Sequence, residues 1–196
     1  MIGREIVNNL YEYFIQKYGT TESVAYQKAQ TAFIKSMAAY SMIMYLLQIK
    51  DRHNGNIMID NFGHLIHIDF GFILDISPGG VNFESSPFKL TSEMVTILGG
   101  DSNSAPYKMF TESVVRAYLC ARPYMEEITR MISLMQESSL PCFKSHTIQK
   151  LKDRFQFQKT EKGAADFMWE RVRESHENTR SKLYDGFQYL QNGIPY

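Results

Sequence analysis

The chain has 196 residues, of which 44% are hydrophobic and 21% are charged, and its formal net charge is zero. These values are typical of one ordinary globular domain with enough chain to bury a core, and they exclude a global electrostatic field that would attract nucleic acid. The two cysteines, Cys120 and Cys142, are too few for a disulfide framework and lack metal-type spacing, so we expect two free thiols in a reducing cytosol.

The first fifty residues have the apolar spacing of helices. One helix is predicted over 4–18, with Gly19 as its C-cap, and a longer one over about 22–47, with Thr20 or Thr21 as its N-cap. The longer helix carries an apolar stripe, which predicts that it forms the core of a helical lobe: Phe33, Met37, Tyr40, Met44 and Leu47.

A β-hairpin is predicted directly after this helix. Two short apolar runs, 57–60 and 64–68, flank Asn61-Phe62-Gly63, and Asn and Gly tolerate the positive φ that tight turns need. With the turn near residue 61 or 62, antiparallel pairing places Asn56 opposite residues 67–69. Neighbouring strands are about 4.8 Å apart, so the Asn56 amide oxygen and the Asp69 carboxylate could share one Mg²⁺, a cation that prefers oxygen ligands.

The polar residues at the open end of this hairpin indicate phosphoryl transfer. Asp51, Arg52 and His53 come just before Asn56, and a metal pair next to a proton acceptor is what phosphoryl transfer requires. His53 is the predicted general base, with Asp51 as the alternative. We expect Arg52 to anchor the loop through charge-assisted hydrogen bonds rather than to touch a substrate.

Residues 72–92 are predicted to be a loop with a turn at Pro78-Gly79-Gly80. The remaining chain is helical in pattern, with capping signals at Thr91 and at Gly99-Gly100. The apolar positions between residues 183 and 194 are interpreted as core, and so is Trp169, with contact to a membrane as the alternative for both. The predicted helices are 91–98, 107–121, 123–137, 145–155, 160–176 and 178–191.

The motif Asp51-Arg-His-x-x-Asn56, followed by His67-Ile-Asp-Phe-Gly71, resembles the catalytic and metal-binding loops of the phosphatidylinositol 3-/4-kinase family. Three further stretches look closest to its type III alpha 4-kinases, and the resemblance spans nearly the whole chain: 36–56, 77–80 and 189–196. It implies a mainly α fold with a small β-hairpin, in which residues 1–196 are the C-terminal, larger lobe of a lipid-kinase catalytic domain. The catalytic loop would be 49–57 and the activation loop 69–92.

The resemblance also implies an activity, which is transfer of the ATP γ-phosphate to the 4-hydroxyl of phosphatidylinositol with Mg²⁺ or Mn²⁺ held by Asn56 and Asp69. Position in the family gives Met58 and Ile68 as the floor of the adenine pocket and Lys89 as a substrate-binding residue in the activation loop. Residues 72–92 of that loop have a net charge of −1, which favours the unphosphorylated lipid. The implied partners are phosphatidylinositol in a membrane and scaffold or regulatory proteins, without nucleic acid. The implied location is cytoplasmic, at the periphery of the plasma membrane.

Two alternatives stay open. The first is a Ser/Thr protein kinase of the related large-kinase group, which shares Asp51-Arg-His-x-x-Asn56. The second is a catalytically silent fragment that acts as a binding module, because the first 50 residues contain only Gly3 and Gly19 and show no strand-rich small lobe with a phosphate-covering loop. We therefore expect little or no turnover from these 196 residues alone.

Overall fold

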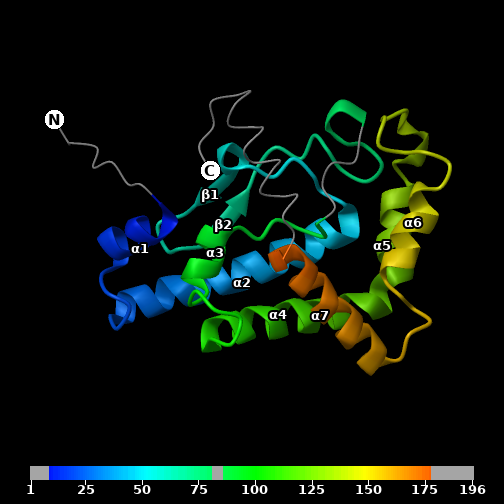
Figure 1. Cartoon of the computed structure of the whole chain (residues 1–196). Coiled ribbons are helices and arrows are strands. Elements are labelled where there is room, and N and C mark those ends of the chain that lie inside the picture. The colour runs from blue at the N-terminus through cyan, green and yellow to red at the C-terminus, as the bar shows by residue number, and fades with distance from the viewer. Residues whose placement is uncertain (1–8, 81–85, 178–196) are drawn as a thin grey trace.

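The computed structural model describes residues 9–80 and 86–177, and within these ranges one antiparallel hairpin lies against a group of helices (Figure 1). This confirms the prediction of a mainly α fold with a small β-hairpin. The strands are β1 (Ile57–Ile59) and β2 (Leu65–His67). The helices are α1 (Leu10–Tyr18), α2 (Val24–Leu47), α3 (Ser92–Ile97), α4 (Ala105–Ala121), α5 (Met125–Ser133), α6 (Thr147–Arg154) and α7 (Glu161–Glu177).

Helix α2 is the centre of the core, as its apolar stripe predicts. It packs against α1, α4, α6 and β2, and Figure 1 shows it between the hairpin above and α4 below. Phe33, Met37 and Met44 are at most 2% exposed, whereas Tyr40 and Leu47 pack at the edge of the core. A helix buried against several elements can fix the position of whatever follows its C-terminus.

The N-cap of α2 differs from the prediction. The hydroxyl of Ser23 accepts the N–H of Tyr26 at 3.1 Å and donates to the carbonyl of Tyr18 at 2.8 Å. Ser23 therefore caps α2 and ties it to the end of α1, so the assignment to Thr20 or Thr21 was wrong. Gly19 ends α1 with a φ of 89°, as predicted.

The later helices agree with the predicted elements but differ at their ends. The predicted cap Thr91 accepts the N–H of Met94 at the start of α3. Helix α4 begins two residues early because Ser104 acts as its N-cap. Helix α5 is shorter than predicted at both ends, since Pro123 lies in a preceding 3-10 turn and the helix ends at Ser133. The predicted helix 178–191 lies outside the described residues.

Trp169 was predicted to be a core residue and is 52% exposed. The buried positions of α7 are Ala164, Met168, Val172 and Ser175, which repeat at intervals of three or four. Trp169 follows Met168 by one residue, about 100° further around the helix, and so lies beside the buried stripe rather than within it.

The thiols behave as the composition suggests: Cys120 is exposed, Cys142 is buried, and both are free. In the part of the chain that the structure describes, no helix combines the length and the apolar character needed to cross a bilayer.

Candidate functional site

The hairpin turn is organised by one carboxylate and one glycine. Asp60 Oδ1 accepts the N–H groups of Phe62 and His64, both at 2.8 Å, and Oδ2 lies 2.9 Å from His64 Nδ1. Desolvation acts to raise the pKa of the Asp60 carboxyl, but these hydrogen bonds outweigh it and hold that pKa below its usual range. Gly63 has a φ of 93°, and a Cβ at this position would lie 2.7 Å from the carbonyl oxygen of Ala29 in α2.

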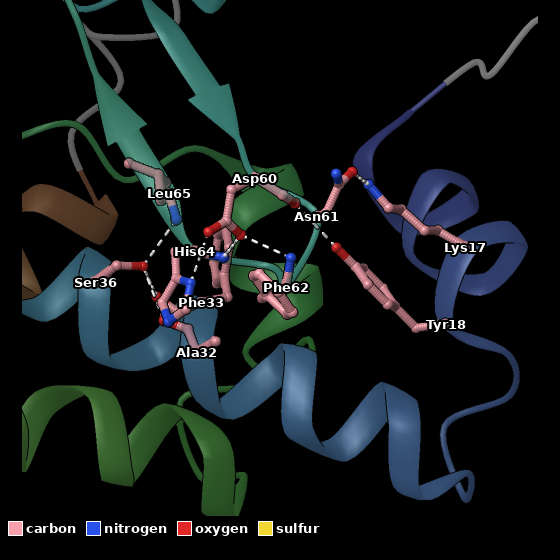
Figure 2. A network of polar contacts seen from close by, with 10 residues as sticks. All are labelled: Lys17, Tyr18, Ala32, Phe33, Ser36, Asp60, Asn61, Phe62, His64 and Leu65. Atoms are coloured by element: carbon pink, nitrogen blue, oxygen red, sulfur yellow. Dashed lines mark hydrogen bonds and ion pairs between the residues drawn. The ribbon is translucent and has the colours of Figure 1, made fainter.

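Side chains of α1 and α2 hold this turn in place (Figure 2). Ser36 Oγ in α2 accepts the N–H of Leu65 at 2.9 Å. From α1, Lys17 Nζ donates to Asn61 Oδ1 at 2.8 Å, and the Tyr18 hydroxyl donates to a backbone carbonyl of the turn at 3.2 Å. The hairpin is thus fixed to two helices at its turn, which also fixes where its open end lies.

The strand register is the predicted one. Beyond the last ladder pair, the N–H of Ile68 donates to the carbonyl of Asn56 at 3.0 Å. Asn56 therefore lies opposite Ile68 and next to Asp69 in the backbone, as the turn position predicts. The ladder pairs are Ile57 with His67, Met58 with Ile66, and Ile59 with Leu65.

The two faces of the hairpin differ in burial. Leu65 and His67 face the core and are 2% and 5% exposed, whereas Met58, Ile66 and Ile68 are between 39% and 53% exposed. The structure thus brings Met58 and Ile68 onto one solvent-facing apolar surface. An apolar surface of this kind can accept a flat aromatic ring.

His67 is a buried group on the core-facing side. Its ring centroid lies 4.5 Å from that of Tyr40. Burial, and then the charge of Arg52, lower the pKa of His67 to about 4. The imidazole is therefore neutral near pH 7 and packs against Tyr40.

Arg52 is a buried cation that joins the two chain segments at the open end. It is 2% exposed. Its Nε donates to the carbonyl of Lys50 at 3.0 Å, Nη1 donates to that of Ile68 at 2.8 Å, and Nη2 donates to that of Asp69. The guanidinium also lies 5.6 Å from the centre of the Phe70 ring. These contacts are those of a backbone anchor for both sides of the site.

Asn56 and Asp69 offer oxygen atoms with spare lone pairs. The Asn56 Oδ1 atom accepts the N–H of His53 at 3.0 Å, and Nδ2 donates to the carbonyl of Asp51. This network fixes the amide orientation and leaves one lone pair on Oδ1. Asp69 is exposed, and its Oδ1 accepts a long hydrogen bond of 3.3 Å from Gly71.

A cation at this position would have few protein ligands. Among the described residues, no group of three or more His, Cys, Asp or Glu side chains is placed to hold a metal ion. One carboxylate and one amide oxygen suit Mg²⁺, which keeps waters and phosphate oxygens as its other ligands. The donor set at Asn56 and Asp69 therefore fits that ion and does not suit zinc, which prefers nitrogen and sulfur ligands.

His53 and Asp51 form the polar pair beside these oxygens. Their side chains are each 18% exposed, and His53 Nε2 lies 4.0 Å from Asp51 Oδ2. His53 Nδ1 accepts the N–H of Gly55 at 3.1 Å. Because Nδ1 is the acceptor, the neutral ring carries its proton on Nε2. A carboxylate oxygen of Asp51 can accept a proton directly, whereas His53 must release the N–H of Gly55 before its Nδ1 can accept one, because Nε2 already carries the ring proton.

Lys89 is a buried residue in the segment that precedes α3. It is 8% exposed and lies between Phe88 and Leu90, which are both in the core. The N–H of Phe88 donates to Ser175 Oγ of α7 at 3.3 Å. The assignment of Lys89 to substrate binding stays a prediction.

The net charge of residues 72–92 does not take into account that Asp75 is paired with residues of α6. Lys150 Nζ of α6 lies 2.8 Å from Asp75 Oδ1, and Thr147 Oγ1 donates to Asp75 Oδ2. Lys50, which precedes Asp51 and belongs to none of the sequence motifs described above, donates to Ser77 Oγ at 2.9 Å. The sequence shows these residues only as isolated charges, because their pairing depends on how the loop folds back.

The chain matches known proteins over its whole length. The family described as "Phosphatidylinositol 3- and 4-kinase" matches residues 2–145. The chain is 53% identical over its full length to "Phosphatidylinositol 4-kinase stt4" of Schizosaccharomyces pombe and covers 10% of that protein. It is 46% identical to human "Putative phosphatidylinositol 4-kinase alpha-like protein P2", of which it covers 33%. With "Phosphatidylinositol 4-kinase beta" of Xenopus laevis it shares 45% identity over 95% of the chain and 23% of that relative. The chain thus spans between about a tenth and a third of the length of these relatives.

Proposed function

The chain belongs to the phosphatidylinositol 3- and 4-kinase family, and from this premise we propose that it carries the metal-binding and proton-accepting part of a phosphatidylinositol 4-kinase site. The reaction is transfer of the ATP γ-phosphate to the 4-hydroxyl of phosphatidylinositol. The names of the relatives support the lipid and the 4-position.

The observation that carries this proposal is the pairing of Asn56 with Ile68 at the open end of the hairpin. It places Asn56 opposite the residue that precedes Asp69, and Arg52 donates to the carbonyls of Ile68 and Asp69. In our proposal the Asn56 amide oxygen and the Asp69 carboxylate hold Mg²⁺, which when bound neutralises charge on the ATP phosphates. Arg52 supports the proposal as a scaffold, since it is buried and donates to backbone carbonyls on both sides of the proposed site.

The proton of the inositol hydroxyl passes to the pair formed by Asp51 and His53. The hydrogen bond from Gly55 to His53 Nδ1 favours the Asp51 carboxylate as the acceptor in the conformation described. His53 becomes the acceptor if substrate binding releases Gly55. Catalytic hydrogen bonds often form only in the substrate complex, so both residues belong to the proposed site.

The exposed face of the hairpin accounts for nucleotide binding in this proposal. Met58 and Ile68 provide an apolar floor for the adenine, which a small lobe would cover. Residues 1–196 then correspond to the larger lobe, with the catalytic loop at 49–57 and the activation loop at 69–92. The activation loop and Lys89 meet the inositol headgroup, which places the enzyme at a membrane surface.

The test is a transfer assay with labelled ATP, Mg²⁺ and vesicles that contain phosphatidylinositol. We expect little turnover from the 196 residues alone and clear turnover from the longer protein that contains them. Chromatography of the deacylated product distinguishes the 4-phosphate from the 3-phosphate. The matched control is the longer protein with Asp69→Asn, which should lose the labelled lipid.

Other outcomes would favour the alternatives. Phosphorylation of protein substrates without labelled lipid would replace the lipid kinase by a protein kinase. Absence of any transfer by the longer protein would favour a binding module. Robust turnover by the isolated chain would overturn the assignment of residues 1–196 to one lobe.

A further inference from the structure

Lys50 is a buried lysine whose ammonium group lies among acceptors of the segment that follows the hairpin. It is 9% exposed. Its Nζ donates to the carbonyl of Leu74 at 3.2 Å, to the carbonyl of Ile76 at 3.4 Å, and to Ser77 Oγ at 2.9 Å. A buried ammonium needs several good acceptors to offset the loss of its hydration, and the three acceptors named here belong to one short segment.

The same segment is attached to the end of α2 through its backbone. The N–H of Leu74 donates to the carbonyl of Leu47 at 2.8 Å, and the N–H of Lys50 donates to the carbonyl of Phe72 at 2.9 Å. Leu74 has a φ of 56°, a left-handed conformation that costs a branched residue free energy and persists only when its surroundings enforce it. Lys50 binds the carbonyl of this strained residue and so helps to enforce the conformation.

We propose that Lys50 is a positioning residue that holds residues 72–77, the start of the proposed activation loop, against the C-terminal end of α2. The role in catalysis rests on the proposed function, whereas the structural role does not. Lys50 and Arg52 then bind two different segments at the open end of the hairpin. Arg52 donates to the carbonyls of Ile68 and of the proposed metal ligand Asp69. Lys50 donates to residues 74–77 of the proposed activation loop.

This division has a specific consequence for substrate binding. Loss of Lys50 leaves the contacts of Arg52 to Ile68 and Asp69 in place, so the ATP-binding side is retained. It removes the donors at Leu74, Ile76 and Ser77 together, so the 72–77 segment relaxes. The Michaelis constant for phosphatidylinositol should therefore rise while that for ATP does not.

Hydrogen exchange tests the structural part on the 196-residue chain itself. Lys50→Met keeps an unbranched side chain but has no donor, and Lys50→Arg restores a cationic donor. We expect amide exchange in peptides over residues 72–77 to be about tenfold faster in Lys50→Met, the change given by about 1.4 kcal/mol of lost opening free energy. Lys50→Arg should recover part of the protection. Lys162→Met, at an exposed position of α7, is the matched control and should not change it.

Kinetics in the longer, active protein test the catalytic part. We expect a severalfold rise in the Michaelis constant for phosphatidylinositol in Lys50→Met, with the constant for ATP unchanged and partial rescue in Lys50→Arg. A merely structural lysine would instead lower the amount of active protein and leave both constants alone. Equal changes in both constants would overturn the division between Lys50 and Arg52.

Each failure is distinguishable. Unchanged exchange over residues 72–77 in Lys50→Met would overturn the positioning role, whatever the enzyme does. If the longer protein lacks lipid kinase activity, the exchange experiment still decides the structural role. If Lys50→Met does not fold, Ser77→Ala removes one acceptor and should give a smaller increase in exchange over the same peptides. Wild-type exchange over these peptides in Ser77→Ala would then reject the proposal, since Ser77 Oγ is the nearest of the three acceptors named above.

Discussion

The two ends of the hairpin are built in different ways. The turn end is held from outside by side chains of α1 and α2, as Figure 2 shows. The open end is held from inside by two buried cations, Arg52 and Lys50, which bind backbone carbonyls. Six non-glycine residues of the described ranges have a positive φ, and four of them lie at or near the open end: Gln48, Asp51, Asp69 and Leu74.

The turn end thus fixes the position of the hairpin, whereas the open end carries the residues of the proposed site. A left-handed conformation costs a non-glycine residue about 1–2 kcal/mol, so the open end is locally strained. Two of the strained residues, Asp51 and Asp69, carry the carboxylates of the proposed site. The turn fixes the hairpin at little conformational cost, and the buried cations stabilise the strained backbone that aims these carboxylates.

The largest expected effect is at the open end. Asp69→Asn, made in a protein that contains this chain and is active as a lipid kinase, should reduce kcat by more than about 100-fold. Mutation of a residue that only hydrogen-bonds to a metal ligand already costs about 10–100-fold. His53→Gln should cost about tenfold less than Asp69→Asn, since a largely dissociative transition state depends more on metal and positioning than on the base. Transfer of labelled phosphate to lipid measures both, with thermal unfolding as a check on folding.

Asp101→Asn is the matched control, because Asp101 is an exposed carboxylate in the loop before α4. It should retain wild-type activity. A loss in His53→Gln as large as that in Asp69→Asn would contradict the greater importance of the metal ligand. A loss in Asp51→Asn larger than in His53→Gln would identify Asp51 as the main acceptor.

At the turn end, the largest expected effect is on stability. In Gly63→Ala the new Cβ meets the backbone of Ala29 at 2.7–2.9 Å, and the φ of 93° is unfavourable for alanine. Conformational strain and overpacking together should lower the free energy of unfolding by roughly 3 kcal/mol. Gly100→Ala is the control, since its φ is 76° but no atom lies within 4 Å of the added Cβ. Urea unfolding should show a clearly smaller loss for the control, and equal losses would show that the close approach to α2 is unimportant.

A smaller effect is expected where α2 meets β2. Ser36→Ala removes the acceptor of the Leu65 N–H, which is then left unpaired next to the core at a cost of roughly 1–2 kcal/mol. Ser113→Ala in α4 is the control, because Ser113 Oγ makes only a bond of 2.7 Å to Met109 in its own helix. Chemical unfolding measures both variants. A loss in the control as large as in Ser36→Ala would assign the effect to the helix rather than to the hairpin.

The sequence predicts the turn end better than the open end. Asn61 and Gly63 between two apolar runs are a local signal for a hairpin, and the register follows from the position of the turn. The pairing of Asn56 with Ile68 could therefore be predicted from the chain alone. The family motif likewise identifies Asp51, His53 and Asp69 as candidate site residues from the sequence alone.

The contacts of the open end could not be predicted in the same way. Lys50 shows no periodicity, and its acceptors lie 24 to 27 residues away in a loop. The pairing of Asp75 with Lys150 joins residues 75 positions apart, so a charge count within the loop misses it. Such contacts depend on the folded path of an irregular segment, for which spacing gives no rule.

The smallest expected effect is the dependence of the turn on pH. The pKa of the Asp60 carboxyl is lowered in the folded protein, so its contribution to stability is present above its usual value of 3.8 and is lost as the pH falls through the folded value. Asp60→Asn should therefore be less stable than wild type near neutral pH, and this difference should disappear in acid. Urea midpoints between about pH 7 and pH 2 measure it. His64→Gln, which removes a ring that lowers this pKa, should show a smaller loss in acid than wild type. If both variants show the same dependence of the urea midpoint on pH as the wild type, the charge of Asp60 does not contribute to the stability of the turn.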